Sequence, residues 1–180
     1  MNNYNEIDGN LIQFALNGTF DVITHGCNCF CQMGAGIAPQ MAKAFGCNQF
    51  RQEIEIPGDI NKLGNIDCGT SYLKEGFKPL VYTSKIIKKC LIADGYKELT
   101  VINSYTQYHY GKNHNDGVEK PINYNALSLC LQKINHLFKG KHIGLPKIGA
   151  GLAGGDWVKI KQIIQRELID CNVTVVIFNK

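Results

Sequence analysis

The densest group of chemically reactive side chains lies in residues 25–38, HGCNCFCQMGAGIA. His25, Cys27, Cys29 and Cys31 are residue types that bind zinc or take part in nucleophilic catalysis. Their one-residue spacing differs from the usual zinc knuckle, in which about two to four residues separate the cysteines, and no second ligand cluster occurs in the sequence. A cysteine nucleophile needs a neighbouring base, and His25 is the only nearby candidate. We therefore expect no metal, although zinc binding and a cysteine nucleophile remain alternatives.

A third interpretation is that this segment is a loop that binds an anion. It follows an apolar run at 20–24 and passes through Gly34 and Gly36 into a helical pattern that begins near residue 35. Glycines let a ligand approach the backbone, and the N-terminus of a helix presents free N–H groups at the positive end of its dipole. Phosphate groups favour this arrangement.

A second glycine-rich turn supports the third interpretation. Residues 145–157, LPKIGAGLAGGDW, follow an apolar run at 142–146 and precede the last helical pattern. In a parallel sheet both loops leave the carboxyl ends of their strands, where ligands of open α/β folds bind. Two such loops predict a site for a diphosphate. Neither loop has the spacing of a Rossmann or a Walker motif.

Strands alternate with helices along the chain, which predicts an α/β domain with a largely parallel sheet. Apolar runs typical of strands covered on both faces predict strands at 20–24, 99–105, 142–146 and 173–178, with weaker candidates at 4–7 and 69–73. Apolar residues at helical spacing predict three helices, one that begins near residue 35, one within 123–140 and one with Asp156 as its N-cap. We expect one domain over residues 1–180 and a long mobile loop at 109–121. Segments 47–68 and 74–98 have no clear pattern.

Composition and charge narrow the classes of partner. The chain has 180 residues, 44% of them hydrophobic, and a formal net charge of +4. Its lysines are scattered rather than interleaved with aromatic residues, so we expect no nucleic-acid partner. The sequence has no apolar run of membrane-spanning length and no signal-peptide pattern at its N-terminus. We expect a cytoplasmic monomer (in the host cytoplasm if the source is viral), with its eight cysteines reduced and no membrane association.

The two glycine loops, in this order, resemble those of macro domains. The resemblance rests on MGAGIA at 33–38 and PKIGAGL at 146–152, with IDGNLI at 7–12 before them and VINSYTQ at 101–107 between them. It covers most of the chain and implies a three-layer α/β/α fold with a mixed central sheet. It also implies a pocket for ADP-ribose, with the diphosphate between the two loops and no cofactor.

The resemblance assigns two groups of residues to the ends of this ligand. Many family members have a Gly-Asp pair whose aspartate meets the adenine amino group. The matching pair here is Gly9-Asn10, flanked by Asp8 and Leu11, so the carboxylate is replaced by an amide. The asparagine that meets the distal ribose in the family corresponds to Asn28.

The resemblance also assigns the phosphate loops. The matching residues are Gly34, Ala35, Gly36 and Ile37 in the first loop and Ile148, Gly149, Ala150, Gly151 and Leu152 in the second. Tyr105 and Gln107 match residues that lie near the adenosine or the distal ribose in relatives.

Departures from the family motifs bear on activity. The glycohydrolase branch uses a lysine after the middle strand and an aspartate after G-x-G-L, where this sequence has Gln107 and Ala153. The phosphatase branch carries a histidine in an H-x-C-N-C context, which matches His25. The resemblance therefore implies hydrolysis of ADP-ribose-1″-phosphate, with His25 as general acid or base and Asp156 orienting a water or the histidine. Hydrolysis of ADP-ribosyl esters or O-acetyl-ADP-ribose, and binding without turnover, are the alternatives.

Overall fold

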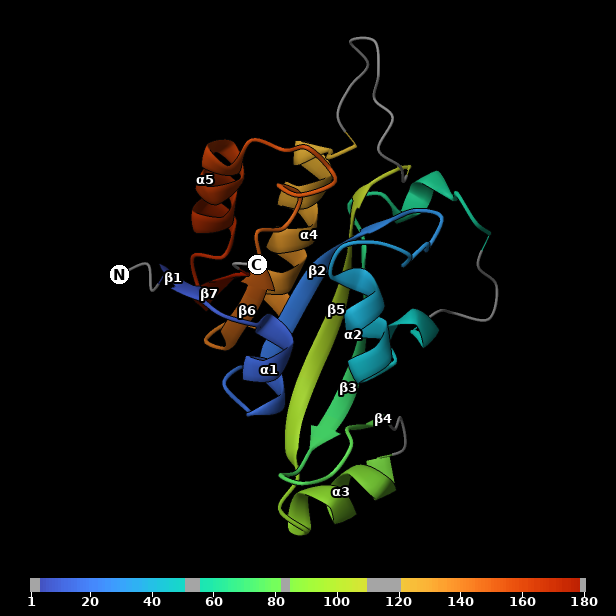
Figure 1. Ribbon diagram of the computed structural model, residues 1–180, viewed down its shortest axis with the longest axis vertical. Coiled ribbons are helices and arrows are strands. Elements are labelled where there is room, and N and C mark those ends of the chain that lie inside the picture. The colour runs from blue at the N-terminus through green and yellow to red at the C-terminus, as the bar shows by residue number, and fades with distance from the viewer. Residues whose placement is uncertain (1–3, 51–55, 82–84, 110–120, 179–180) are drawn as a thin grey trace.

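One mixed sheet organises the fold, which a computed structural model describes for residues 4–50, 56–81, 85–109 and 121–178. Its strands lie in the order β1-β7-β6-β2-β5-β3-β4 (Figure 1). They are β1 (Tyr4–Asp8), β2 (Val22–Asn28), β3 (Ile66–Leu73), β4 (Leu80–Val81), β5 (Lys97–Gln107), β6 (His142–Pro146) and β7 (Asn172–Ile177). The first five in this order are parallel, whereas β3 and β4 pair antiparallel at one edge. The expected parallel core and the mixed sheet are both confirmed.

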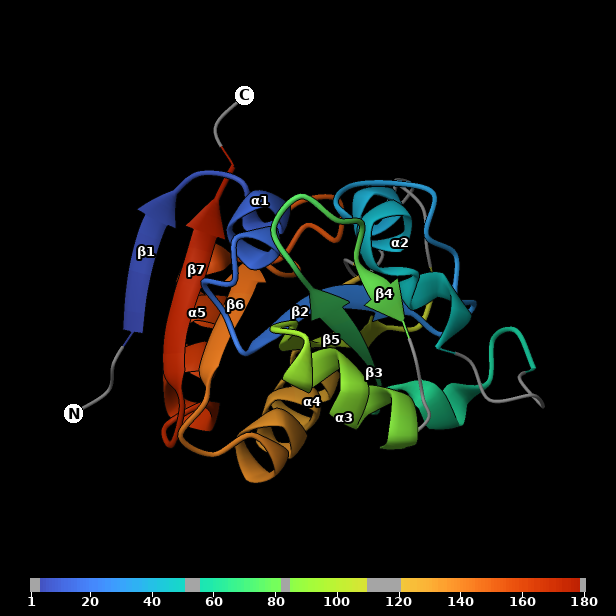
Figure 2. The same cartoon turned by 90° about the horizontal axis from the view of Figure 1, so that it is seen from below.

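Helices cover both faces of the sheet, which gives the three layers that the resemblance implied (Figure 2). They are α1 (Leu11–Leu16), α2 (Ala38–Phe45), α3 (Lys85–Ala93), α4 (Tyr124–Leu137) and α5 (Trp157–Glu167). Helices α1 and α2 pack on one face, and α4 and α5 pack on the other. No helix in the described ranges is both long and apolar enough to cross a membrane.

Alternation along the central strands divides the core into two halves. Val22 of β2 packs with the apolar side chains of α4 and α5, and the next residue, Ile23, packs with those of α1 and α2. Leu131 of α4 and Ile160 of α5 are fully buried in the first half, as is Met41 of α2 in the second. Each such side chain contributes about 1.5–3 kcal/mol by its burial, so both helical layers hold the sheet rigidly from opposite sides.

The predicted strands and helices all occur, but several boundaries differ, and two of these differences lie next to the first glycine loop. Strand β2 continues to Asn28, because residues 25–28 pair with β5 instead of starting the loop. Helix α2 begins at Ala38 instead of near residue 35, and Pro39 lies in its first turn as expected. Helices α1 and α3 and strand β4 were not predicted. The long loop expected at 109–121 lies, apart from its two end residues, outside the described residues.

Candidate functional site

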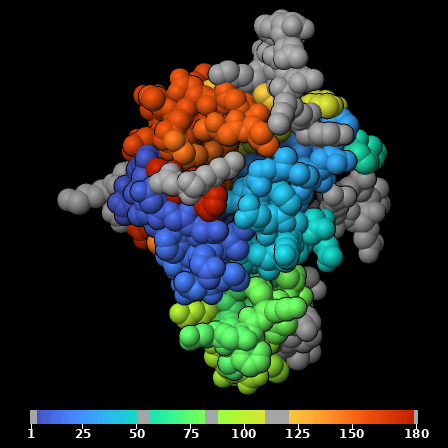
Figure 3. All heavy atoms as spheres, viewed as in Figure 1, coloured from blue at the N-terminus to red at the C-terminus, as the bar shows by residue number. Residues whose placement is uncertain are grey.

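Two glycine loops face each other at the carboxyl ends of the central parallel strands. The first follows β2 and the second follows β6, and these strands are parallel neighbours, paired through Val22 and Ile143. A Cβ atom added to Gly36 in the first loop would lie 3.8 Å from Cδ1 of Leu152 in the second. Figure 3 shows the first loop in light blue and the second in orange on the same face of the molecule. The two segments that the sequence pairs as phosphate loops are therefore together in space.

The first loop exposes a run of backbone donors. None of the N–H groups of residues 34–37 donates a hydrogen bond within the described part of the chain. Gly34, Ala35 and Gly36 are exposed, and Ile37 is half-buried. Ile37 is also the N-cap of α2 and provides no side-chain acceptor. The positive end of the α2 dipole is therefore open to an anion.

The second loop also contains N–H groups without an acceptor. Four of its N–H groups donate to no acceptor in the described ranges, those of Gly149, Gly151, Leu152 and Ala153. Other amides close the turn that holds them, because Gly155 donates to the Gly149 carbonyl and Gly154 to the Gly151 carbonyl, both at 2.9 Å. Both loops thus offer fixed donors without side-chain acceptors, which is the arrangement that binds phosphate oxygens.

Glycine is required at defined points of these loops. Gly36 and Gly149 have φ angles of +64° and +73°, in the left-handed region that other residues rarely adopt. A Cβ atom on Gly155 would lie 2.7 Å from the Gly149 carbonyl oxygen. Among the predicted second-loop residues, Ile148 is buried at 2% exposure, whereas Leu152 is 53% exposed. Ile148 therefore anchors the loop, and Ala150 is half-buried beside it.

His25, the predicted general acid or base, lies on β2 without exposed surface. Its Nε2 lies 2.9 Å from Oδ1 of Asn103, and the Sγ atoms of Cys27 and Cys47 lie 3.8 and 3.7 Å from the same nitrogen. Burial lowers the pKa of His25 to about 4, because the charged ring would lose its hydration. The ring is therefore neutral at pH 7 and enclosed by the core. Direct contact between His25 and a ligand has no support in this geometry.

Asn28, predicted at the distal ribose, ties the first loop to the end of β2. Its Oδ1 accepts the N–H groups of Phe30 and Gln32 at 3.1 and 3.2 Å. Its Nδ2 donates to the Gln32 carbonyl at 2.8 Å, and the residue is 5% exposed. Asn28 thus shapes the loop through all three bonds. A contact with a ribose remains a prediction.

Tyr105 and Gln107, at the end of β5, support the first loop from the side. Tyr105 is 2% exposed, donates from its hydroxyl to the Asp67 carboxylate and lies 3.6 Å from Cys31 Sγ. Burial, together with the hydrogen bond to Asp67, raises the pKa of Tyr105. Gln107 donates from Nε2 to the His109 carbonyl at 2.9 Å. The contact between the Tyr105 hydroxyl and Cys31 joins the end of β5 to the first loop.

Asn10, predicted at the adenine, is the N-cap of α1. Its Oδ1 accepts the N–H groups of Ile12 and Gln13 at 2.9 and 3.2 Å. The side-chain oxygen is therefore engaged with the helix, and the amide nitrogen is the part that remains for another partner. Leu11, the first residue of the helix, is 3% exposed and belongs to the core. Its side chain is therefore not available to a ligand, and only its backbone could make the predicted contact.

An exposed aromatic residue that the sequence analysis missed lies beside this turn. Gly9 donates its N–H to the carbonyl of Ile177, the last residue of β7, at 2.9 Å. Phe178 follows directly and is 63% exposed, and Asp8 at the end of β1 is also exposed. From the sequence alone, a phenylalanine at the end of an apolar strand is expected to be buried in the core. Only the strand order shows that it lies at the edge where the loops emerge.

Asp156, the second predicted catalytic residue, is exposed at the start of α5. Its Oδ1 accepts the Val158 N–H at 2.8 Å, which makes it the expected N-cap. Its own N–H donates to the hydroxyl of Tyr124 at 2.9 Å. The other carboxylate oxygen has no partner within the described ranges, so a water can bind there next to the second loop.

The cysteines of the opening segment are packing groups. All eight cysteines are free thiols, and Cys27, Cys29 and Cys31 are buried. Burial raises the pKa of Cys29 to about 11 and that of Cys27 well above its ordinary value, which disfavours the nucleophilic thiolate. Within the part of the chain that the structure describes, no three histidine, cysteine or acidic side chains are arranged to hold a metal ion.

A viral protein resembles this chain over most of its length. The uncharacterized 17.5 kDa protein in the tk-vs intergenic region of Enterobacteria phage T4 is 31% identical over 147 residues, which cover 79% of this chain and 76% of that protein. This chain belongs to the same family. No protein-family model matches it.

Solved structures show the fold of this family member. A protein of unknown function from Bacteroides thetaiotaomicron has a TM-score of 0.62 at 24% identity, with 97% of each chain covered. The macrodomain of Thermus aquaticus DarG has a TM-score of 0.55 at 20% identity, with 98% of each chain covered. Thermosipho africanus DarTG, solved in complex with ADP-ribose, has a TM-score of 0.56 at 18% identity, and the match covers 97% of this chain and 41% of that one. The fold is that of a macro domain.

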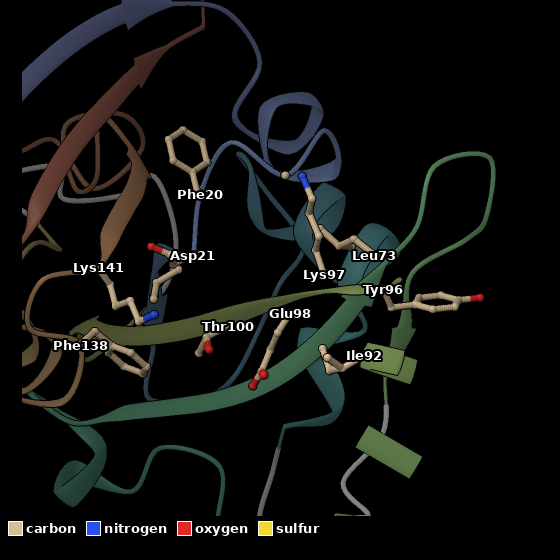
Figure 4. A pocket seen from close by; sticks show the side chains of 12 residues that line it. Phe20, Asp21, Leu73, Ile92, Tyr96, Lys97, Glu98, Thr100, Phe138 and Lys141 are labelled. Carbon is tan, nitrogen blue, oxygen red and sulfur yellow. The ribbon is translucent and has the colours of Figure 1, made fainter. Parts of the chain in front are cut away.

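A cavity lies elsewhere in the fold, away from the glycine loops. It has a volume of about 490 Å³ and lies at the amino ends of β2 and β5 (Figure 4). Charged side chains of both signs line it, including Asp21, Lys97, Glu98 and Lys141, next to Phe20. The strands separate this hollow from the glycine loops at their other ends. The candidate site therefore rests on the backbone donors of the loops and not on cavity size.

Proposed function

We propose that this chain binds ADP-ribose, with the diphosphate between residues 34–37 and 149–153. The observation that carries this proposal is the pair of facing loops in which eight N–H groups, those of residues 34–37 and of Gly149, Gly151, Leu152 and Ala153, donate to no acceptor within the described ranges. Amides held by turns need no reorganisation when an anion arrives, so little of the binding energy is spent on ordering them. The open N-terminus of α2 and the net charge of +4 add a favourable field for a diphosphate.

The rest of the ligand extends along the carboxyl ends of the strands. On one side of the loops lie the Gly9-Asn10 turn and the exposed ring of Phe178, which suit a purine. On the other side lies Asn28, where the distal ribose fits if it displaces part of the loop's own hydrogen bonding. The ADP-ribose complex of the Thermosipho africanus protein, which shares the fold, supports the choice of ligand.

Calorimetry with ADP-ribose and AMP tests this proposal. ADP-ribose should bind more tightly than AMP, because only the longer ligand spans both loops and reaches the second ribose position. Gly36→Glu adds bulk and negative charge where the diphosphate belongs, and should weaken ADP-ribose binding by about a hundredfold or more. Gly76→Glu is the matched control, because Gly76 has a similar φ of +78° and open space around it. Equal affinity for the two ligands, or Gly36→Glu binding as the control does, contradicts the two-loop site.

The narrower proposal is that the chain hydrolyses ADP-ribose-1″-phosphate. The exposed Asp156 carboxylate favours it, because one oxygen caps α5 while the other is available to hold and deprotonate a water beside the second loop. The buried and neutral His25 is a positioning residue in this scheme, since it supports β2 beneath the first loop. Attack of the Asp156-bound water on phosphorus would form a new P–O bond and break the bond between phosphorus and the 1″ oxygen. The proton that Asp156 takes from the water would pass to that oxygen, so phosphate leaves and ADP-ribose stays in the loops.

Phosphate release in a turnover assay tests the narrower proposal. Asp156→Asn keeps an N-cap acceptor but removes the charge, and should slow turnover by about a hundredfold with little change in melting temperature. Asp21→Asn is the matched control, because Asp21 is also exposed and accepts one backbone N–H, from His142, at the opposite end of the strands. ADP-ribose binding without phosphate release would leave either a binder or a hydrolase of ADP-ribosyl esters or O-acetyl-ADP-ribose. Acetate release from O-acetyl-ADP-ribose would then distinguish the hydrolase from the binder.

A further inference from the structure

Exposed aromatic side chains flank the glycine loops on both sides. Phe178, 63% exposed, follows β7 on one side. On the other side Tyr108, 41% exposed, follows β5. Because β7 and β5 are parallel to β6 and β2, both residues lie at the carboxyl ends of the strands, where the glycine loops also leave the sheet.

The ring of Tyr108 belongs to a cluster of three. Phe30, in the first loop, lies with its ring centroid 5.5 Å from that of Tyr108 and 5.0 Å from that of His109, both in edge-to-face geometry. The backbone fixes the cluster to the loop, because Cys29 donates its N–H to the carbonyl of Tyr108 at 3.0 Å. Gly58 lies against Phe30, with a hypothetical Cβ 2.8 Å from the ring, which leaves Phe30 little freedom to rotate. We call these three residues the β5 aromatic cluster.

The strand order places Phe178 and Tyr108 on opposite sides of the pair of glycine loops. The sequence of neighbours is β7, β6, β2 and β5, with the loops on the middle two strands. Neighbouring strands lie about 4.8 Å apart, so the strands that carry Phe178 and Tyr108 are separated by roughly 14 Å. ADP-ribose has one base and can occupy only one aromatic position. Its distal ribose ends near Asn28 and leaves the β5 aromatic cluster without a stacking partner.

We infer that the ligand carries a second aromatic base on its distal ribose, so that the site takes a pyrophosphate-linked dinucleotide of the NAD⁺ type. This inference rests on the proposed binding of the diphosphate and the first ribonucleotide. One base stacks on Phe178 and the other on the β5 aromatic cluster, while the loops hold the pyrophosphate between them. The positive charge of a nicotinamide ring adds a favourable interaction with the faces of Phe30 and Tyr108.

Calorimetric titrations with ADP-ribose and NAD⁺ test the inference. The wild-type protein should bind NAD⁺ about tenfold more tightly than ADP-ribose, because stacking on an aromatic side chain is worth about that factor. Tyr108→Ala should abolish this preference and leave the affinity for ADP-ribose unchanged, and Tyr108→Trp should restore it. Phe77→Ala is the control, because Phe77 is also an exposed aromatic residue, at 63%, and lies between β3 and β4, away from the glycine loops. Melting curves show whether each variant is folded.

The outcomes separate the two proposals. Tight binding of ADP-ribose with equal or weaker binding of NAD⁺ overturns the dinucleotide inference and leaves the proposed function in place. A Tyr108→Ala variant that loses affinity for both ligands equally, or that keeps the preference for NAD⁺, also overturns it. Failure of the wild-type protein to bind either ligand overturns both proposals.

Discussion

Stability below pH 6.5 should depend strongly on His25. The ring is fully buried, and its environment is ordered by a second hydrogen bond, because Asn103 donates from Nδ2 to the Cys47 carbonyl at 2.8 Å. This bond turns Oδ1 of Asn103 toward His25, so the ring nitrogen Nε2 carries the proton and donates it at 2.9 Å. Protonation of the other nitrogen would place a full charge among Cys27, Cys47 and the apolar side chains of the α2 face.

The size of the effect follows from proton linkage. Burial lowers the pKa of His25 from 6.5 to about 4 in the folded protein, whereas the unfolded chain keeps the ordinary value. The unfolded state therefore binds more protons between these two values, and acid favours unfolding. The contribution of His25 to stability is fully present above pH 6.5 and is lost as the pH falls toward 4. The loss is about 2 kcal/mol at pH 5 and about 3 kcal/mol at pH 4.

Urea unfolding from pH 7.5 to pH 4, on the wild type and on His25→Gln, measures this loss. Glutamine can still donate to Asn103 but has no titrating group, so the unfolding free energy of the variant should fall with acid by about 3 kcal/mol less than that of the wild type. His136→Gln is the control, because His136 is exposed on α4. Parallel curves for wild type and His25→Gln would refute the buried neutral ring. An exposed and titrating His25 would then be available for proton transfer.

Two further predictions concern the ends of the ligand. Asn28→Ala removes the bonds to Phe30 and Gln32, so the unfolding free energy should fall by about 1–3 kcal/mol and ADP-ribose binding should weaken as the first loop loosens. Loss of affinity without loss of stability, seen by urea unfolding and calorimetry, would instead indicate direct contact with the ribose. Phe178→Ala should weaken ADP-ribose binding by about tenfold with an unchanged melting temperature, because the side chain is 63% exposed. Unchanged affinity would remove Phe178 from the purine site.

The sequence predicted the long apolar elements of the fold and missed the short ones. Residues 143–145 and 173–176 are buried on both faces of the sheet, so their apolar side chains are consecutive and conspicuous in the sequence. Helix α1 has six residues and depends on the Asn10 cap and on burial of Leu11 and Ala15, which only the tertiary structure supplies. The apolar residues of a helix this short form no recognisable periodic pattern. Strand β4 has two residues and forms only by pairing with β3.

The same reasoning explains which site residues could be predicted. The glycines of the two loops are visible in sequence, because the required backbone conformations restrict the residue type. The role of His25 was not visible, because a histidine in a loop and a histidine in a strand look alike in sequence. Continuation of β2 to Asn28 places His25 on the same face as Ile23, inside the core. The aromatic residues after β5 and β7 could not be assigned to one edge until the order of the strands was known.

A site made from main-chain donors has a consequence for how the family can vary. The N–H groups of residues 34–37 and 149–153 do not titrate, so diphosphate binding should change little between pH 6 and 8, whatever the side chains nearby. Side chains at exposed loop positions such as Leu152 can then change without loss of the phosphate contacts, whereas Gly36 and Gly149 cannot, since their positive φ angles shape the loops. Differences in ligand preference between members should therefore arise from the residues on the two sides of the loops. In this chain our proposals place those ends at Phe178 and at the β5 aromatic cluster.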